Sequence, residues 1–174
     1  MLDKRAVGMT LLGMFLFALA AGCSGRRAPT AQTLGGDRPG DLSDLQAGLL
    51  SGINRERQRR GLPALEFDAR LAAAARAHSR DMARGGFFEH RGSDGSQVGE
   101  RIEAQGYDWR FYAETIACGQ RTADQVLTGW MESRAHRDNL LSAQAEDAGV
   151  GIAVSEETDC GIYWTAVFGA EQQP

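Results

Sequence analysis

The sequence predicts an α+β domain with a mainly antiparallel sheet. A helical apolar period comes early in the chain, over 44–60, whereas strand-like sequence is concentrated near the end, at 148–155 and 161–170. A short polar turn separates these last two segments, which indicates an antiparallel hairpin. Helices and strands do not alternate along the chain, so the order of elements does not favour a parallel βαβ sheet.

The two longest predicted helices follow from their apolar periods and their ends. In 44–60 an apolar residue recurs every four positions, at Leu45, Leu49 and Ile53, before Gly61 and Pro63. A second helix begins after Asp68, a residue suited to an N-cap, and ends at Gly85. One face of this second helix carries Leu71, Ala75, His78 and Met82.

Shorter elements fill the middle of the chain. A short helix is predicted after Asp94, with Val98 and Ile102 on one side and Gly106 at its end. Thr122 and Gln125 have the spacing of a capping box and predict another helix. Between these two helices, FYAETIAC (111–118) is typical of a strand.

The N-terminal region predicts export followed by a tether. Lys4 and Arg5 precede an apolar run, and small residues then lead directly to Cys23. We interpret 1–22 as a lipoprotein signal peptide, 23–43 as a flexible tether rich in Gly, Pro, Ser and Thr, and 44–171 as the domain.

Cys23 ends the motif LAAGC, which resembles the lipobox of bacterial lipoproteins. In those proteins the cysteine is acylated, palmitate being a typical chain, and becomes the mature N-terminus. We therefore expect lipidation at Cys23 and the membrane as a partner through that lipid. The alternative is an ordinary signal peptide that happens to contain a cysteine.

Two further cysteines, Cys118 and Cys160, remain for an exported domain. An even number of cysteines in an oxidising compartment favours a disulfide between them. Two separately buried thiols are the alternative that the sequence leaves open.

The charge of the chain does not indicate a nucleic-acid partner. Its formal net charge is −4, and no basic stripe stands out. The most basic stretch, NRERQRR (54–60), is interpreted as a solvated helix face.

Three residues have no local structural explanation. The chain has three histidines; His78 lies on an apolar helix face and is interpreted as a core residue, whereas His90 and His136 lie in polar breaks. Glu114 is an acidic residue inside a strand-like segment. Two imidazoles and a carboxylate could converge on a zinc site with an open position, although no HExxH or CxxC occurs. No GxSxG motif supports serine catalysis either.

An ordered set of motifs resembles the bacterial branch of the CAP superfamily, which includes cysteine-rich secretory proteins, antigen five and plant pathogenesis-related proteins. The motifs cover about 45–170: LAAAARAHSRDMARGGFFEHRGSDGS, RIEAQGYDW, AETIACGQRTADQV, GWMESRAHRDNLL, AGVGIAV and YWTAVFG. This resemblance implies a three-layer α-β-α sandwich with a cleft lined by His90, Glu114 and His136. Some members bind a divalent metal there, so the same three residues are candidate metal ligands.

The resemblance also frames the expected function. We expect a lipid-anchored cell-envelope protein whose cleft binds a small or extended ligand: a lipid, a peptide or a glycan. In a Gram-negative cell it would sit on the periplasmic face of the outer membrane. The alternatives are an envelope hydrolase, either metal-dependent or using His and Glu as acid and base, and a purely structural envelope protein.

Overall fold

A computed structural model describes residues 39–172, and its centre is a four-stranded sheet in the order β1-β3-β4-β2. The strands are β1 (Glu66–Phe67), β2 (Trp109–Cys118), β3 (Asp147–Val154) and β4 (Ile162–Glu171). β3 and β4 form the predicted antiparallel hairpin, and β2 pairs antiparallel with β4 on its other side. Only the two-residue β1 runs parallel to its neighbour, β3.

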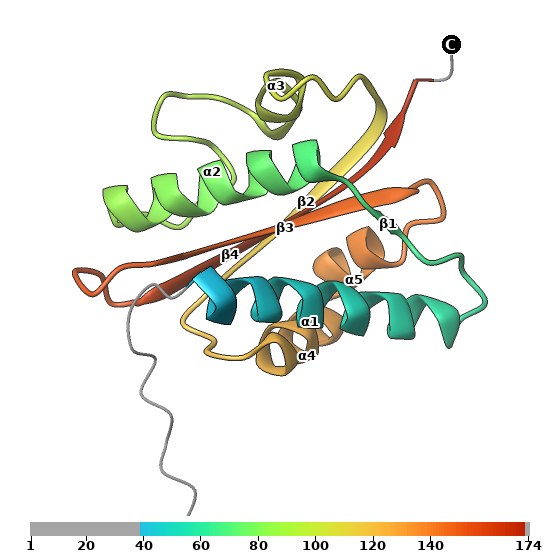
Figure 1. Ribbon diagram of the computed structural model, residues 1–174, viewed down its shortest axis with the longest axis horizontal. Helices are drawn as coiled ribbons and strands as arrows, with labels where there is room; N and C mark the ends of the chain where they lie inside the picture. The colour runs from blue at the N-terminus through green and yellow to red at the C-terminus, as the bar shows by residue number, and fades with distance from the viewer. Residues whose placement is uncertain (1–38, 173–174) are drawn as a thin grey trace, which may run out of the picture. The chain divides into compact units, whose positions relative to one another are not determined.

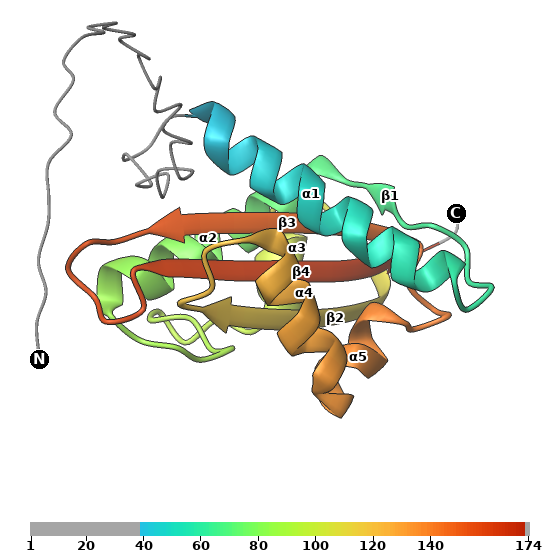
Figure 2. The same cartoon turned by 90° about the horizontal axis from the view of Figure 1, so that it is seen from below.

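Helices cover both faces of this sheet (Figures 1 and 2). One face carries α2 (Ala69–Gly85) and α3 (Val98–Glu103), and the other carries α1 (Pro39–Gln58), α4 (Ala123–Glu132) and α5 (Arg134–Leu140). The larger apolar cluster lies between the second group and the sheet, and Trp130 and Trp164 are its largest fully buried side chains. The predicted α+β class and the three layers are therefore confirmed.

Alternation along β2 decides which side chains reach which layer. Ala113 and Ala117 face the cluster under α1, α4 and α5. Ile116 faces the opposite side, where it packs with Met82 of α2. Because successive strand residues point to opposite faces, Glu114 shares the α2 side with Ile116. A carboxylate is thus directed into the layer between the sheet and α2.

The observed ends differ from the predicted ones at several places. α1 begins at Pro39, inside the segment 23–43 that we predicted as tether. α5 was predicted as a polar break, and β1 was not predicted at all. The predicted signal peptide and Cys23 lie outside the described residues. Within the described part of the chain, no helix combines the length and apolar character that crossing a bilayer requires.

The interpretation of 54–60 as a solvated helix face is wrong at one position. Arg57 is only 1% exposed. Its guanidinium donates to four backbone carbonyl oxygens, those of Pro63, Leu140, Ser142 and Ala145. The arginine therefore fastens the end of α1 to the end of α5 and to the segment leading into β3.

The predicted disulfide is present. Cys118, the last residue of β2, is bonded to Cys160, which lies two residues before β4, across a sequence separation of 42. This bond ties down the end of the strand that carries Glu114, four residues from it. The alternative of two separate thiols is excluded.

Candidate functional site

The carboxylate of Glu114 is the centre of the candidate site. Its side chain is only 2% exposed, yet both oxygens have cationic or hydrogen-bonding partners. Oε1 lies 2.8 Å from Nδ1 of His90, and Oε2 lies 2.8 Å from Nη2 of Arg101. A buried carboxylate is stable only when it is paired and hydrogen-bonded in this way. We call His78, His90, Arg101 and Glu114 the Glu114 cluster.

Arg101 connects Glu114 to the loop that carries His90. It comes from α3, and its side chain is 11% exposed. Besides Glu114 it donates to the backbone oxygen of His90 at 3.0 Å and to that of Ser96 at 3.0 Å. The guanidinium therefore has three oxygen acceptors, only one of which is charged.

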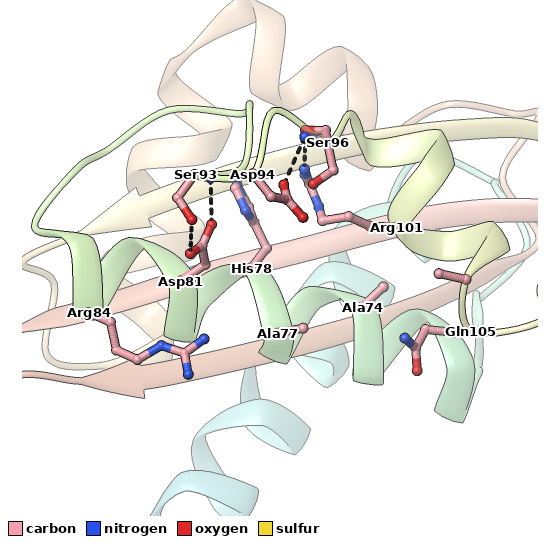
Figure 3. A pocket seen from close by; sticks show the side chains of 11 residues that line it. Ala74, Ala77, His78, Asp81, Arg84, Ser93, Asp94, Ser96, Arg101 and Gln105 are labelled. Atoms are coloured by element: carbon pink, nitrogen blue, oxygen red, sulfur yellow. Dashed lines mark hydrogen bonds between the residues drawn. The ribbon is translucent and has the colours of Figure 1, made fainter.

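The loop between α2 and α3 is also fixed from α2. The carboxylate of Asp81 accepts from the backbone N–H and the hydroxyl of Ser93 (Figure 3). One helical turn earlier, Nε2 of His78 donates to the backbone oxygen of Glu89 at 2.9 Å. Two side chains of α2 thus hold the backbone of this irregular loop, one before His90 and one after it. These contacts account for the defined position of His90.

His90 is held on one side and open on the other. A carboxylate oxygen can only accept a hydrogen bond, so Nδ1 of His90 carries the proton toward Glu114. The side chain is still 52% exposed. The arrangement resembles the carboxylate–histidine pairs that fix a ring's tautomer and leave Nε2 for a ligand.

α5 brings His136 to the same region. Asn139 donates from its side-chain amide to the backbone oxygen of Glu114 at 3.0 Å. His136 lies three residues earlier, on the same face of α5. It also meets the indole of Trp130 edge-on, with ring centroids 6.5 Å apart. Burial, followed by the nearby charge of His90, lowers the pKa of His136. The structure therefore brings His90, Glu114 and His136 to one region.

His78 lies in the core, as predicted, with 1% exposure. It is nevertheless close to the site, because its Nε2 lies 3.9 Å from Oε1 of Glu114. Burial lowers its pKa, more strongly than the carboxylate of Glu114 raises it. Its Nδ1 has no hydrogen-bond partner.

The burial of His78 predicts how the stability of the protein depends on pH. Because its folded pKa lies below the usual 6.5, the unfolded chain binds the proton more readily. The contribution of His78 to stability is therefore complete above pH 6.5 and is lost as the pH falls toward the folded pKa. We expect His78→Gln, which can still donate to Glu89, to lose less unfolding free energy than the wild type between about pH 7.5 and 5.5. Urea unfolding at both pH values measures this. Equal losses in the two proteins would contradict a lowered pKa of His78 in the folded protein.

The three predicted metal ligands do not fit a direct three-ligand site. Oε2 of Glu114 accepts a hydrogen bond from a guanidinium and Oε1 accepts one from an imidazole N–H, so both oxygens already have a hydrogen-bond donor as partner. Among residues 39–172, no group of three or more His, Cys, Asp or Glu side chains is arranged to hold a metal.

A cavity of about 250 Å³ lies on the α2–α3 side of the cluster. Figure 3 shows His78 and Asp81 on one wall, and Ser93 and Arg101 across from them. His90 and His136 do not line this cavity. The exposed face of His90 is therefore separate from it.

The sequence patterns did not identify Arg101 or Asn139 as site residues, although both contact Glu114. Asn139 stands three residues after His136, and such a spacing on one helix face would have been a usable signal had α5 been predicted. Arg101 is one of many arginines in the chain, and nothing in its spacing distinguishes it.

Comparison with known proteins assigns this chain to a family. Residues 50–168 match the model of the cysteine-rich secretory protein family, CAP. The chain is 32% identical over 130 residues to the uncharacterized protein YkwD of Bacillus subtilis. That match covers 75% of this chain but 49% of YkwD, so the chain spans about half the length of this relative.

Solved structures show the same fold. An extracellular protein of Bacillus anthracis that contains an SCP domain superposes with a TM-score of 0.65 at 28% identity, covering 79% of this chain and 45% of that one. An outer surface protein of Borrelia burgdorferi gives a TM-score of 0.68 at 20% identity, covering 78% of this chain and 96% of that one. The chain belongs to the CAP family, the cysteine-rich secretory protein family.

Proposed function

We propose that this protein is a lipid-anchored CAP-domain module of the cell envelope that binds a small or extended ligand at His90 and His136. The observation that carries the proposal is the bond between His90 and Glu114. A buried, doubly bonded carboxylate holds a histidine whose side chain is 52% exposed. Such preorganisation lowers the ordering cost of binding, and no apolar packing of His90 explains it.

The chemistry of the site suggests a ligand with hydroxyl or other polar groups. With Nδ1 committed to Glu114, a neutral His90 presents Nε2 as an acceptor. The lowered pKa of His136 favours its neutral form. The exposed Nε2 of His90 and the imidazole of His136 suit the hydroxyls of a glycan or the polar groups of a peptide or lipid head. The extracellular and surface relatives support a ligand of the envelope.

The ligand can be sought directly. Full-length protein extracted gently from native membranes should carry a defined small species in native mass spectrometry. His90→Ala and His136→Ala should lose it, whereas Glu156→Gln, at an exposed turn between β3 and β4, should keep it. The proposal is wrong if no species is retained, or if both histidine variants retain it as well as the wild type.

The proposed lipid anchor can be tested separately, by substitution of Cys23. If the cysteine is acylated, Cys23→Ser should move the protein from the membrane fraction to the soluble fraction, because the acyl chains provide the attachment. Fractionation and the intact mass of the mature chain measure this. A variant that stays in the membrane fraction with the wild-type mass would exclude lipidation at Cys23.

The same histidine–carboxylate pair gives a second candidate, an envelope hydrolase. Glu114 orients His90 as it would orient a general base, with the opposite nitrogen free to accept a proton. Turnover of envelope glycan or peptide that is abolished in His90→Ala would favour the hydrolase. Retention of an unaltered ligand would favour the binding module.

A further inference from the structure

Arg101 lies among three oxygen atoms at the site, one from Glu114 and two from the backbone of the loop between α2 and α3. The guanidinium lies 2.8 Å from Oε2 of Glu114, 3.0 Å from the oxygen of His90 and 3.0 Å from that of Ser96. One carboxylate and two backbone carbonyls are a typical set of oxygen ligands for a cation. In this chain the set is already satisfied by a side chain of the protein.

We propose that Arg101 is the permanent internal cation of the site, which neutralises Glu114 and prevents a divalent metal from binding it. Glu114 then serves only to position His90, so the ligand meets the two imidazoles without a metal ion bound to Glu114. The inference concerns the site of the proposed function, but it does not depend on which ligand binds there.

Burial makes the exclusion effective. Both side chains of the ion pair are largely withdrawn from water, with 11% of Arg101 and 2% of Glu114 exposed. A metal ion bound to the same carboxylate would lie next to an arginine that cannot lose its charge. Swinging Arg101 away would instead remove its hydrogen bonds to the loop of His90. A cation that takes the place of Arg101 at Oε2 of Glu114 therefore displaces the residue that holds the loop.

A titration with Zn²⁺ alone tests the inference. Full-length protein freed of metal with a chelator is titrated by calorimetry as the wild type, Arg101→Met, Arg101→Lys and the double variant Arg101→Met/Glu114→Gln. We expect Arg101→Met to bind Zn²⁺ at least about tenfold more tightly than the wild type, the range by which neighbours of a metal site alter affinity. Arg101→Lys keeps the charge and should show no gain. The double variant lacks the carboxylate and should lose the gain.

Equal affinity in the wild type and Arg101→Met would overturn the proposal, as would a gain that survives Glu114→Gln. If Arg101→Met does not fold, the wild type alone decides. The side-chain N–H signals of Arg101 in NMR should persist unchanged during the Zn²⁺ titration, and their loss would contradict an internal cation that excludes metal. Because the only probe is the metal, failure here leaves the search for the envelope ligand unaffected.

Discussion

Gly151→Ala is expected to prevent stable folding, because α2 packs its backbone directly against β3 at this residue. An ideal Cβ at Gly151 would lie 2.1 Å from the backbone nitrogen of Arg76, and one at Gly149 would lie 2.0 Å from that of Ala72. Both glycines point to the same face of β3, since they are two residues apart. The atoms in the way belong to a helix backbone, so no side-chain rotation can relieve the overlap.

Restoring space for one methyl group would require α2 to move away from the sheet, and His78 and Asp81 would move with it. We expect the free energy of unfolding to fall by more than about 4 kcal/mol, beyond ordinary overpacking of side chains. Circular dichroism and urea unfolding measure the loss. Gly129→Ala is the matched control, because this exposed glycine in α4 has nothing within 4 Å of an added Cβ. It should gain up to about 1 kcal/mol. A Gly151→Ala protein as stable as that control would refute the close packing.

Glu114→Ala is the second substitution for which we expect a large loss. It removes the only carboxylate that contacts Arg101 among the ion pairs of the described residues, and it leaves that guanidinium largely buried. Breaking one side of a buried ion pair typically costs about 3–5 kcal/mol. His90→Ala should cost much less, about 1 kcal/mol or below, because His90 is half-exposed and Arg101 still compensates the carboxylate.

A double-mutant cycle separates the pair from simple loss of volume. Glu114→Leu combined with Arg101→Met removes both charges, and we expect it to be more stable than either single variant, since no unpaired charge remains. Chemical denaturation of the four proteins gives the coupling energy. Additive losses would show that Arg101 and Glu114 do not depend on each other.

Much of the fold could be predicted because it depends on local patterns. The apolar periods in 44–60 and after Asp68, and the hairpin formed by β3 and β4, are visible in a single sequence. β1 was missed because two residues carry no period, and α5 was missed because its seven residues bury only one side chain, Leu140, and so show no apolar period. The resemblance to the CAP family supplied the three layers, which the periods alone do not determine.

The candidate site was predictable only in part, for a similar reason. His90, Glu114 and His136 stood out because polar residues without a local explanation are unusual. Arg57 and Arg101 did not stand out, because an arginine in a polar stretch is normally solvated. Three of the four carbonyls that Arg57 contacts lie more than 80 residues away, and the carboxylate that Arg101 contacts lies 13 residues away. Neither partner follows from helical or strand periodicity.

The tautomer of His90 tests most directly whether Glu114 holds this histidine for a ligand. At a pH where the ring is neutral, long-range ¹H–¹⁵N NMR of the wild-type protein should show the proton on Nδ1, facing Glu114, and an unprotonated Nε2. The Glu114→Gln variant should lose part of this preference, because a neutral amide is a weaker acceptor than a carboxylate. A wild-type ring that is protonated on Nε2, or that averages between both tautomers as a free imidazole does, would contradict the proposed role of the pair.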